Sequence, residues 1–415
     1  MPLPGNLTEK LRRPLALLGG LCFFLSAMEY MVPKPLPFIR LGLANLPLLL
    51  ALDILPFPFF MLLALLKTAG QGLITGTLFS YVLVFSLGGT CLSALVMFAL
   101  HRGLGKARIS LVGISVAGAF ASNMVQLILA RYLIFGDSIR YAAVPILGFG
   151  IITGAILGCL CEYFLGRSRW YDSLYKSVHY DRTPDGAGKG SPRETEFSSK
   201  PADNFTPNLP TAGEEAFARY FALAGLSMAP ALLLNPSTQG RIIQCLFFIL
   251  LARLSGRKIN LPLTITVSLG IVLFNLLVPY GELLLSLGPL RITYGALDGG
   301  IRRAITLAGL LALSRFSVRR NLALPGLFGR ILSQALKVFS SMGEKKSALA
   351  GQNWADGLDH LLLDLDREQN NPEAGEGAYE NVPGITPPVL PRPLYLPVII
   401  ILAWLPLILP VIIRG

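Results

Sequence analysis

Long apolar runs recur along the whole chain and limit its possible folds more than any other feature. A helix needs about 20 apolar residues to cross the hydrocarbon core of a membrane. Runs near or above that length cover residues 14–31, 41–66, 73–100, 109–134, 141–165, 217–234, 241–254, 262–286, 301–314 and 394–413. Only 14% of the residues are charged, whereas soluble domains usually have about 25%. The sequence therefore predicts an all-α membrane protein, a polytopic bundle of about six N-terminal plus four to five C-terminal transmembrane helices in the lipid bilayer.

The charge distribution predicts how these helices are oriented. The net charge is +12 at pH 7, and Lys and Arg stand mostly at the ends of the apolar runs. This positive-inside pattern favours a membrane protein over a nucleic-acid-binding protein. Because Lys10, Arg12 and Arg13 precede the first run, we expect a multi-pass protein of the cytoplasmic (inner) membrane with a cytoplasmic N-terminus. No small-residue cleavage site follows before Met28, which predicts a retained anchor.

The basic loops of the first half require an even number of crossings. Five crossings would place the loop His101–Arg108 and Arg167 outside, and six place both inside. We predict the extra crossing in Leu41–Leu66, where Asp53–Pro58 contains two prolines that remove helical hydrogen bonds. A break at membrane depth is typical of a binding site, and equally of a simple turn between two spans.

Composition divides the chain into five segments. We predict a transmembrane substrate-binding domain at 12–166, a flexible polar linker at 167–215, a transmembrane and coupling domain at 216–346, an acidic Pro-rich linker at 347–393 and a C-terminal transmembrane anchor at 394–413. The two linkers lack the periodic apolar pattern that a packed core requires.

Motifs of the soluble catalytic classes are missing from the sequence. It has no supported Ser-His-Asp arrangement, no H-E-x-x-H and no complete nucleotide-binding loop. The five cysteines lie in or beside apolar runs, and the three histidines lie in polar loops. We therefore expect no enzymatic activity, no catalytic residue, no metal site and no cofactor.

Polar side chains within the first half are the candidate binding residues. Such groups are unfavourable in a membrane helix unless they face protein, water or a ligand. The predicted substrate-binding residues are Lys34, Arg40, Asn45, Lys67, Gln71, Asn123, Gln126 and Arg140. The cations among them would suit a phosphate or carboxylate. Two alternatives stay open, namely snorkelling of the cations to headgroups and helix–helix hydrogen bonding by the amides.

Glycines at four-residue spacing predict close helix packing. Gly150, Gly154 and Gly158 form a double G-x-x-x-G pattern, and Gly72 and Gly76 form another. Small residues at this spacing let membrane helices approach closely. This pattern indicates packing and says nothing about the substrate.

Several motifs of the first half resemble a known membrane family. They are the segments Pro33–Pro47, Lys67–Ser80, Ser86–Thr90 and Gly113–Asn123. This half resembles the Gx transporter family, also labelled heptaprenyl diphosphate synthase component I, which is similar to the substrate-binding S components of energy-coupling factor (ECF) transporters. The likeness covers about residues 12–166, and it implies that this half binds a small-molecule substrate.

The second half is similar to the T component of ECF transporters. The motifs that carry this likeness are Asn235–Arg241, Phe274–Gly281, Leu287–Thr293 and Ala296–Arg303. The likeness implies coupling to cytoplasmic ABC-type ATPases. Because T components usually dock these ATPases through Ala-Arg-small motifs, which this chain lacks, the predicted ATPase-coupling residues are Arg315, Arg319 and Arg320.

These resemblances imply a membrane transporter component of ECF type. It would bind a small, anionic, vitamin- or precursor-like substrate and couple to partner ABC ATPases. The alternative is a membrane accessory subunit of heptaprenyl diphosphate synthase in isoprenoid biosynthesis. The chain lacks the Asp-rich motif with which a prenyltransferase holds magnesium, since Asp359, Asp364 and Asp366 do not reproduce its spacing. A third hypothesis is a scaffold that binds partners through its acidic tail.

Overall fold

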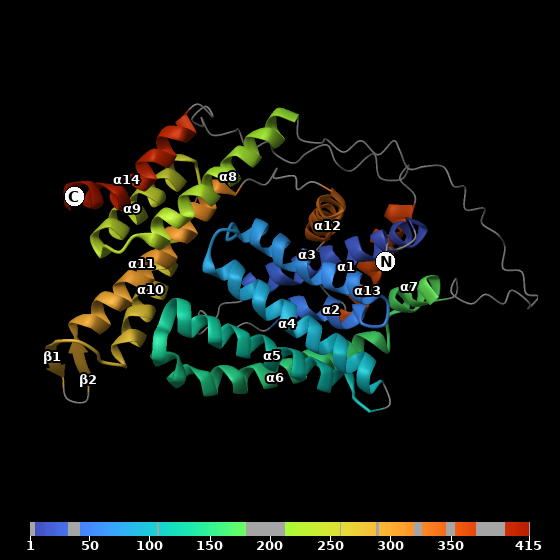
Figure 1. The fold of residues 1–415 in the computed structure, drawn as a ribbon. Coiled ribbons are helices and arrows are strands. Elements are labelled where there is room, and N and C mark those ends of the chain that lie inside the picture. Colours follow the sequence, from blue (N-terminus) through green and yellow to red (C-terminus); the bar gives the residue numbers. More distant parts are fainter. Residues whose placement is uncertain are drawn as a thin grey trace, which may run out of the picture.

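Two groups of long helices meet at an angle in the computed structural model (Figure 1). The structure describes residues 5–31, 42–105, 108–179, 212–257, 259–287, 290–318, 326–345, 353–370 and 395–414. We call residues 5–165 the first block, and residues 212–318 together with 395–414 the second block. Three further helices, which we call the tail helices, pack on the first block.

The first block is a bundle whose later helices pack in chain order. Its elements are α1 (Gly5–Met31), η1 (Leu43–Asn45), α2 (Leu46–Ala51), α3 (Phe57–Thr75), α4 (Tyr81–Leu104), α5 (Leu111–Ala130), η2 (Arg131–Phe135), η3 (Gly136–Ile139) and α6 (Arg140–Leu165). Helices α3, α4, α5 and α6 follow one another side by side, and α1 packs against α3 and α2 (Figure 1).

The predicted break within Leu41–Leu66 is confirmed. Helix α2 ends at Ala51, and α3 begins after Pro56, whose extended backbone (φ −67°, ψ 158°) precedes the first helical turn. Proline is tolerated at this position because the first helical N–H groups have no partner within the helix. Helix α2 has six residues and therefore rises only about 9 Å, so by itself it is shorter than the crossing that we predicted.

Glycines bring α4, α5 and α6 into close contact, at the predicted Gly158 and also at Gly118, which we did not predict. A Cβ at Gly118 of α5 would lie 2.6 Å from Met97 Cγ of α4. A Cβ at Gly158 of α6 would lie only 2.5 Å from the Cα of Val112 on α5. At Gly158 the backbones of α5 and α6 are therefore in direct contact, whereas at Gly118 the glycine makes room for the Met97 side chain.

The second block contains five helices and one hairpin. Its elements are α8 (Ala212–Leu234), α9 (Thr238–Leu254), α10 (Leu261–Leu276), β1 (Leu283–Leu287), β2 (Leu290–Thr293), α11 (Tyr294–Ser317) and α14 (Leu396–Arg414). Helix α11 packs against α8, α9 and α10, and α14 lies along α8 and α9 (Figure 1). Aromatic side chains such as Phe221, Phe248 and Phe316 are fully enclosed in its core.

One apolar run of the second block is not the continuous segment that we predicted. Residues 262–286 divide into α10 and the strand β1, which pairs antiparallel with β2. The helix stops because Pro279 lacks an N–H and Gly281 takes φ +84°, which is left-handed.

The tail helices lie in segments that we predicted as linkers or as part of the coupling domain. They are α7 (Arg169–His179), α12 (Gly326–Glu344) and α13 (Trp354–Asn370). Helix α7 lies within the range 167–215 and α13 within 347–393, both of which we predicted as linkers. Helix α12, which we assigned to the coupling domain at 216–346, packs against α1 and α3 of the first block. The rest of the two predicted linkers lies outside the described residues.

Amphipathic spacing explains why these segments are helices. Trp170 and Leu174 of α7 are buried, as are Leu358 and Leu362 of α13, in each case four residues apart on one helix face. The Asp359 carboxylate accepts hydrogen bonds from the Ser168 hydroxyl at 2.5 Å and the Trp170 backbone N–H at 3.0 Å. A residue of α13 therefore caps the first turn of α7.

Several described helices are long and apolar enough to cross a membrane. The five stretches that qualify are Leu11–Glu29, Phe57–Thr75, Tyr81–Leu104, Leu111–Leu165 and Phe217–Leu234, the fourth of which includes both α5 and α6. Leu261–Leu276 and Leu396–Ile408 are shorter apolar helices. Bulky apolar side chains also face outward, as at Val144, which is 78% exposed, and Ile152 at 59%. Such a surface is suited to lipid.

Candidate substrate-binding site

A cluster of buried polar groups joins the end of α1, the η1 turn and α3. The charged residues Glu29 and Lys67 are each only 6% exposed. Gly42 has φ +78°, which glycine adopts without strain, and its backbone N–H donates to a Glu29 carboxylate oxygen at 3.2 Å. The Lys67 ammonium donates to the side-chain oxygen of Asn45. Buried charges need such partners in an apolar bundle, so these four residues form a defined polar site, which we call the Lys67 cluster.

Hydrogen-bond donors gather at the Lys67 cluster. The Lys67 ammonium carries three N–H donors and donates to the side chain of Asn45. Gln71 lies one turn further along α3 on the same side of the helix and is half-buried. The Lys67 cluster and Gln71 therefore bring one cation and two amide side chains together with the Glu29 carboxylate, and binding of an anionic substrate here stays a prediction.

Two of the predicted binding residues lie between helices instead. The Asn123 amide donates to the carbonyl of Ile146 on α6 at 3.2 Å and lies over Gly150. The Gln126 amide donates to the Ser122 hydroxyl of its own helix at 3.0 Å, where α5 packs on α4. The Asn123 contact favours helix–helix bonding, the alternative given above for the amides, whereas the Gln126 hydrogen bond stays within α5. A role of either residue in substrate binding stays a prediction.

The remaining predicted binding residues are cations. Arg140 begins α6, is exposed and places its guanidinium 5.0 Å from the ring centroid of Tyr141. Its contact is thus with a neighbouring side chain, and the Lys67 cluster does not include it. Lys34 and Arg40 lie outside the described residues, in the connection between Met31 and Gly42.

Of the predicted coupling residues, Arg315 lies where the two blocks meet. It belongs to the last turns of α11, and a Cβ at Gly76 in the α3–α4 turn would lie 3.4 Å from its Cγ. The neighbouring Ser314 hydroxyl accepts a hydrogen bond from the backbone N–H of Phe79 at 3.0 Å. Arg319 and Arg320 lie outside the described residues.

A buried hydrogen-bond network holds the second block, and we did not predict it as a site. Gln244 of α9 is 1% exposed and uses its whole amide. Its oxygen accepts from Asn235 at 3.0 Å, and its nitrogen donates to the carbonyls of Ala231 at 3.1 Å and Ala403 at 2.9 Å. One side chain therefore connects α8, α9 and α14.

Arg241 extends this network to α11. Its guanidinium donates to the Asn235 carbonyl at 2.6 Å and to the Thr306 hydroxyl at 2.7 Å. Thr238 donates to the Asp298 carboxylate at 2.8 Å. The motifs Asn235–Arg241 and Ala296–Arg303 are therefore neighbours in space. Their polar residues at helix ends are the sequence feature from which this network could have been predicted.

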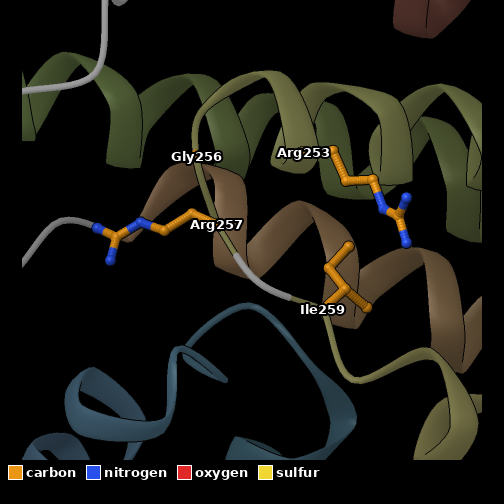
Figure 2. A pocket seen from close by; sticks show the side chains of 4 residues that line it. All are labelled: Arg253, Gly256, Arg257 and Ile259. Carbon is orange, nitrogen blue, oxygen red and sulfur yellow. The ribbon is translucent and has the colours of Figure 1, made fainter.

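An open cavity of about 470 Å³ lies at the α9–α10 turn, lined by Arg253, Gly256, Arg257 and Ile259 (Figure 2). The two arginine side chains point in opposite directions in Figure 2. Arg257 donates instead to the carbonyl of Val318 at 3.2 Å, next to the end of α11. The cavity therefore does not present two guanidinium groups to one ligand. Within the described ranges, no group of three His, Cys, Asp or Glu residues could hold a metal ion.

The fold and its apolar surface define the class: this is an all-α, polytopic membrane protein. Residues 18–164 match the family model described as heptaprenyl diphosphate synthase component I. The resemblance that the sequence of the first block indicated is thereby confirmed, with nearly the predicted bounds.

Residues 218–320 match a domain of unknown function, DUF8519. The likeness of this half to a T component stays a prediction. No curated protein and no solved structure matches the chain.

Proposed function

We propose that the chain is a membrane transporter component of ECF type. In this proposal the first block binds a small, anionic, vitamin- or precursor-like substrate, and the second block couples it to partner cytoplasmic ABC ATPases. The protein lies in the cytoplasmic (inner) membrane with its N-terminus in the cytoplasm. The observation that carries the proposal is the contact between the α3–α4 turn and the Arg315 end of α11.

The positive-inside rule assigns the two contacting ends to opposite sides of the membrane. It assigns the end of α4 with His101 and Arg102 to the cytoplasm, so the other end of this 24-residue helix, at the α3–α4 turn, lies on the outer side. In the second block the rule assigns Arg253, Arg257 and Arg315 to the cytoplasm, and these share one end of the block. The outer end of the first block thus lies against the cytoplasmic end of the second.

The two blocks cannot both stand upright in one bilayer while that contact exists. Figure 1 shows α11 running obliquely to α4, α5 and α6, as a tilted first block requires. In the proposed mechanism, ATP-driven movement after Arg315 tilts the first block, and its outer end moves toward the cytoplasm. The Lys67 cluster travels with that end, because Glu29 lies near the end of α1 and Lys67 in the second half of α3.

Co-purification tests the proposal. The full chain is solubilised from its host in detergent, and mass spectrometry identifies the proteins and small molecules bound to it. ABC ATPases together with an anionic vitamin-like compound would support the transporter. A prenyl synthase without any ATPase would instead support the accessory subunit of isoprenoid biosynthesis.

A cross-link tests the contact itself. Phe79→Cys combined with Ser314→Cys, in a chain whose five native cysteines are replaced, should form a disulfide under mild oxidation. With the ATPases present, ATP should change the yield of this disulfide. The control pair Arg108→Cys and Ser314→Cys joins the opposite end of the first block and should not cross-link. Equal yields for the two pairs would overturn the tilted arrangement.

A further inference from the structure

The β1–β2 hairpin exposes an unusual amount of apolar surface. Leu283, Leu284 and Leu285 are 59%, 54% and 52% exposed. A strand packed on a protein core alternates between buried and exposed residues, and three successive exposed leucines break that rule. The register shift between Leu283 and Leu285 further interrupts the alternation. The hairpin lies at the edge of the molecule, beyond the ends of α10 and α11 (Figure 1).

This apolar surface continues that of α10. Ile265, Leu269 and Leu273 are 63%, 56% and 53% exposed along the helix that leads into the hairpin. Helix α10 belongs to the apolar segments of a membrane protein, so these side chains face lipid. The leucines of β1 therefore extend the same lipid-facing surface past the helix end.

The residues at the base of the hairpin mark a membrane–water boundary. Tyr280 and Tyr294 flank it and are 50% and 61% exposed, and tyrosine is enriched where one part of the ring meets acyl chains and its hydroxyl meets water. Glu282 and Arg291 are exposed in the same segment and would be unfavourable deep in hydrocarbon.

The backbone excludes the bilayer interior. A two-stranded ribbon leaves the outer edge of each strand with unpaired N–H and C=O groups. Hydrocarbon cannot satisfy such groups, and open sheet edges do not occur there. Headgroups and their water can. The depth that satisfies both the leucines and the strand edges is the boundary between headgroups and acyl chains.

We propose that the β1–β2 hairpin is a membrane-interface anchor, with Leu283–Leu285 inserted among the first acyl carbons of one leaflet and its strand edges in the headgroup layer. Arg253 and Arg257 lie at the opposite end of α10, so the positive-inside rule assigns the hairpin to the outer leaflet. The anchor fixes the depth of α10 and α11 in the bilayer, and therefore of the second block.

Fluorescence in vesicles tests this placement. The full chain, with native cysteines replaced, carries a single Leu284→Cys or the milder Ser286→Cys, labelled with an environment-sensitive fluorophore. The vesicles contain only this chain and phosphatidylcholine brominated either near the headgroup or near the acyl terminus. The expected result is blue-shifted emission, quenched several-fold more by the shallow bromines than by the deep ones. Val144→Cys on α6 and Asp364→Cys on α13 serve as the lipid and water references.

Two results would overturn the anchor. Emission equal to that of the Asp364→Cys label would place the hairpin in water, as expected of a surface that docks another protein. Strongest quenching by the deep bromines would place it in the bilayer interior. Ser286→Cys keeps the test valid if Leu284→Cys fails to fold, because it changes a single atom of an exposed side chain.

Discussion

The two blocks stabilise their apolar helices in different ways. In the first block α4, α5 and α6 approach through glycines, and the charged groups of Glu29 and Lys67 gather at one place. In the second block, side chains such as Arg241 and Gln244 spread their hydrogen bonds over four helices. The difference indicates that buried hydrogen bonds fix the geometry of the second block, whereas close glycine contacts bring the helices of the first block together.

The largest expected effect concerns glycine packing in the first block. Gly158→Leu should destabilise the protein by about 1–3 kcal/mol or prevent its folding, because overpacking displaces a backbone, and the new Cβ would lie 2.5 Å from Val112 Cα. Thermal unfolding in detergent measures this. The matched control is Gly148→Leu on the same helix, where nothing lies within 4 Å of the Cβ position. Equal unfolding midpoints for the two variants would show that the close glycine contact at Gly158 does not stabilise the first block.

The next prediction tests whether the buried ammonium of Lys67 binds a ligand. Lys67→Gln should reduce the retained small molecule by about 10- to 100-fold, the value of one charge-assisted hydrogen bond, while membrane insertion is unchanged. The sequence predicts the same for Arg40→Gln. Quantitative mass spectrometry of the purified protein gives the retained amount. Lys176→Gln, which changes an exposed lysine on α7, is the control. Equal retention by Lys67→Gln, Arg40→Gln and this control would contradict the assignment.

In the second block the corresponding prediction is structural. Gln244→Leu removes three hydrogen bonds and should destabilise the block by about 1–3 kcal/mol, because it leaves the Asn235 amide unsatisfied. Hydrogen–deuterium exchange should rise in α14, whose Ala403 carbonyl loses a donor. Gln239→Leu changes an exposed glutamine of the same helix and should have little effect. Unchanged exchange in α14 would mean that apolar contacts alone hold it.

The smallest expected effect is a pH dependence of stability that comes from Asp366 of α13, one of the tail helices packed on the first block. Burial raises the pKa of the Asp366 carboxyl above its ordinary value of 3.8, and the positive charge of Arg13 only partly offsets this rise. The folded chain therefore binds more protons than the unfolded chain, so this contribution to stability is greatest below pH 3.8 and is lost as the pH rises through the raised pKa.

Asp366→Asn should remove this dependence and raise the unfolding midpoint at neutral pH. Unfolding midpoints measured across the acid range check it, with Asp364→Asn, an exposed residue of the same helix, as the reference. Parallel pH profiles for wild type and Asp366→Asn would show that the carboxyl is solvated.

Local features of the sequence anticipated a large part of the fold. Chain hydropathy, the prolines of Asp53–Pro58 and the glycine spacing on α6 act within one or two helical turns, and all three reappear as helices, a break and an interface. We did not predict the helices α7 and α13 from local features, because their short amphipathic patterns are surrounded by polar, Pro-rich sequence. Their helices become stable only when Asp359 caps α7 and both pack on the first block.

The candidate site was only partly predictable. Asn45 and Lys67 were predicted as binding residues, but their pairing across 22 positions depends on the fold of the α1–α3 region. Asn123 and Gln126 carry the same chemical signal and lie between helices. An amide in a membrane helix has the same hydropathy in either role, so its sequence cannot distinguish them.

By itself the sequence determined that this chain is an all-α membrane protein and that its first block resembles the heptaprenyl diphosphate synthase component I family. Only the tertiary structure decided that α12 packs on α1 and that Phe79 meets Ser314, 235 positions away. The physical reason is that hydropathy and local propensity depend only on each residue and its neighbours in the sequence. Apolar helices in lipid have no hydrophobic preference for one another, so close packing and a few hydrogen bonds select their neighbours.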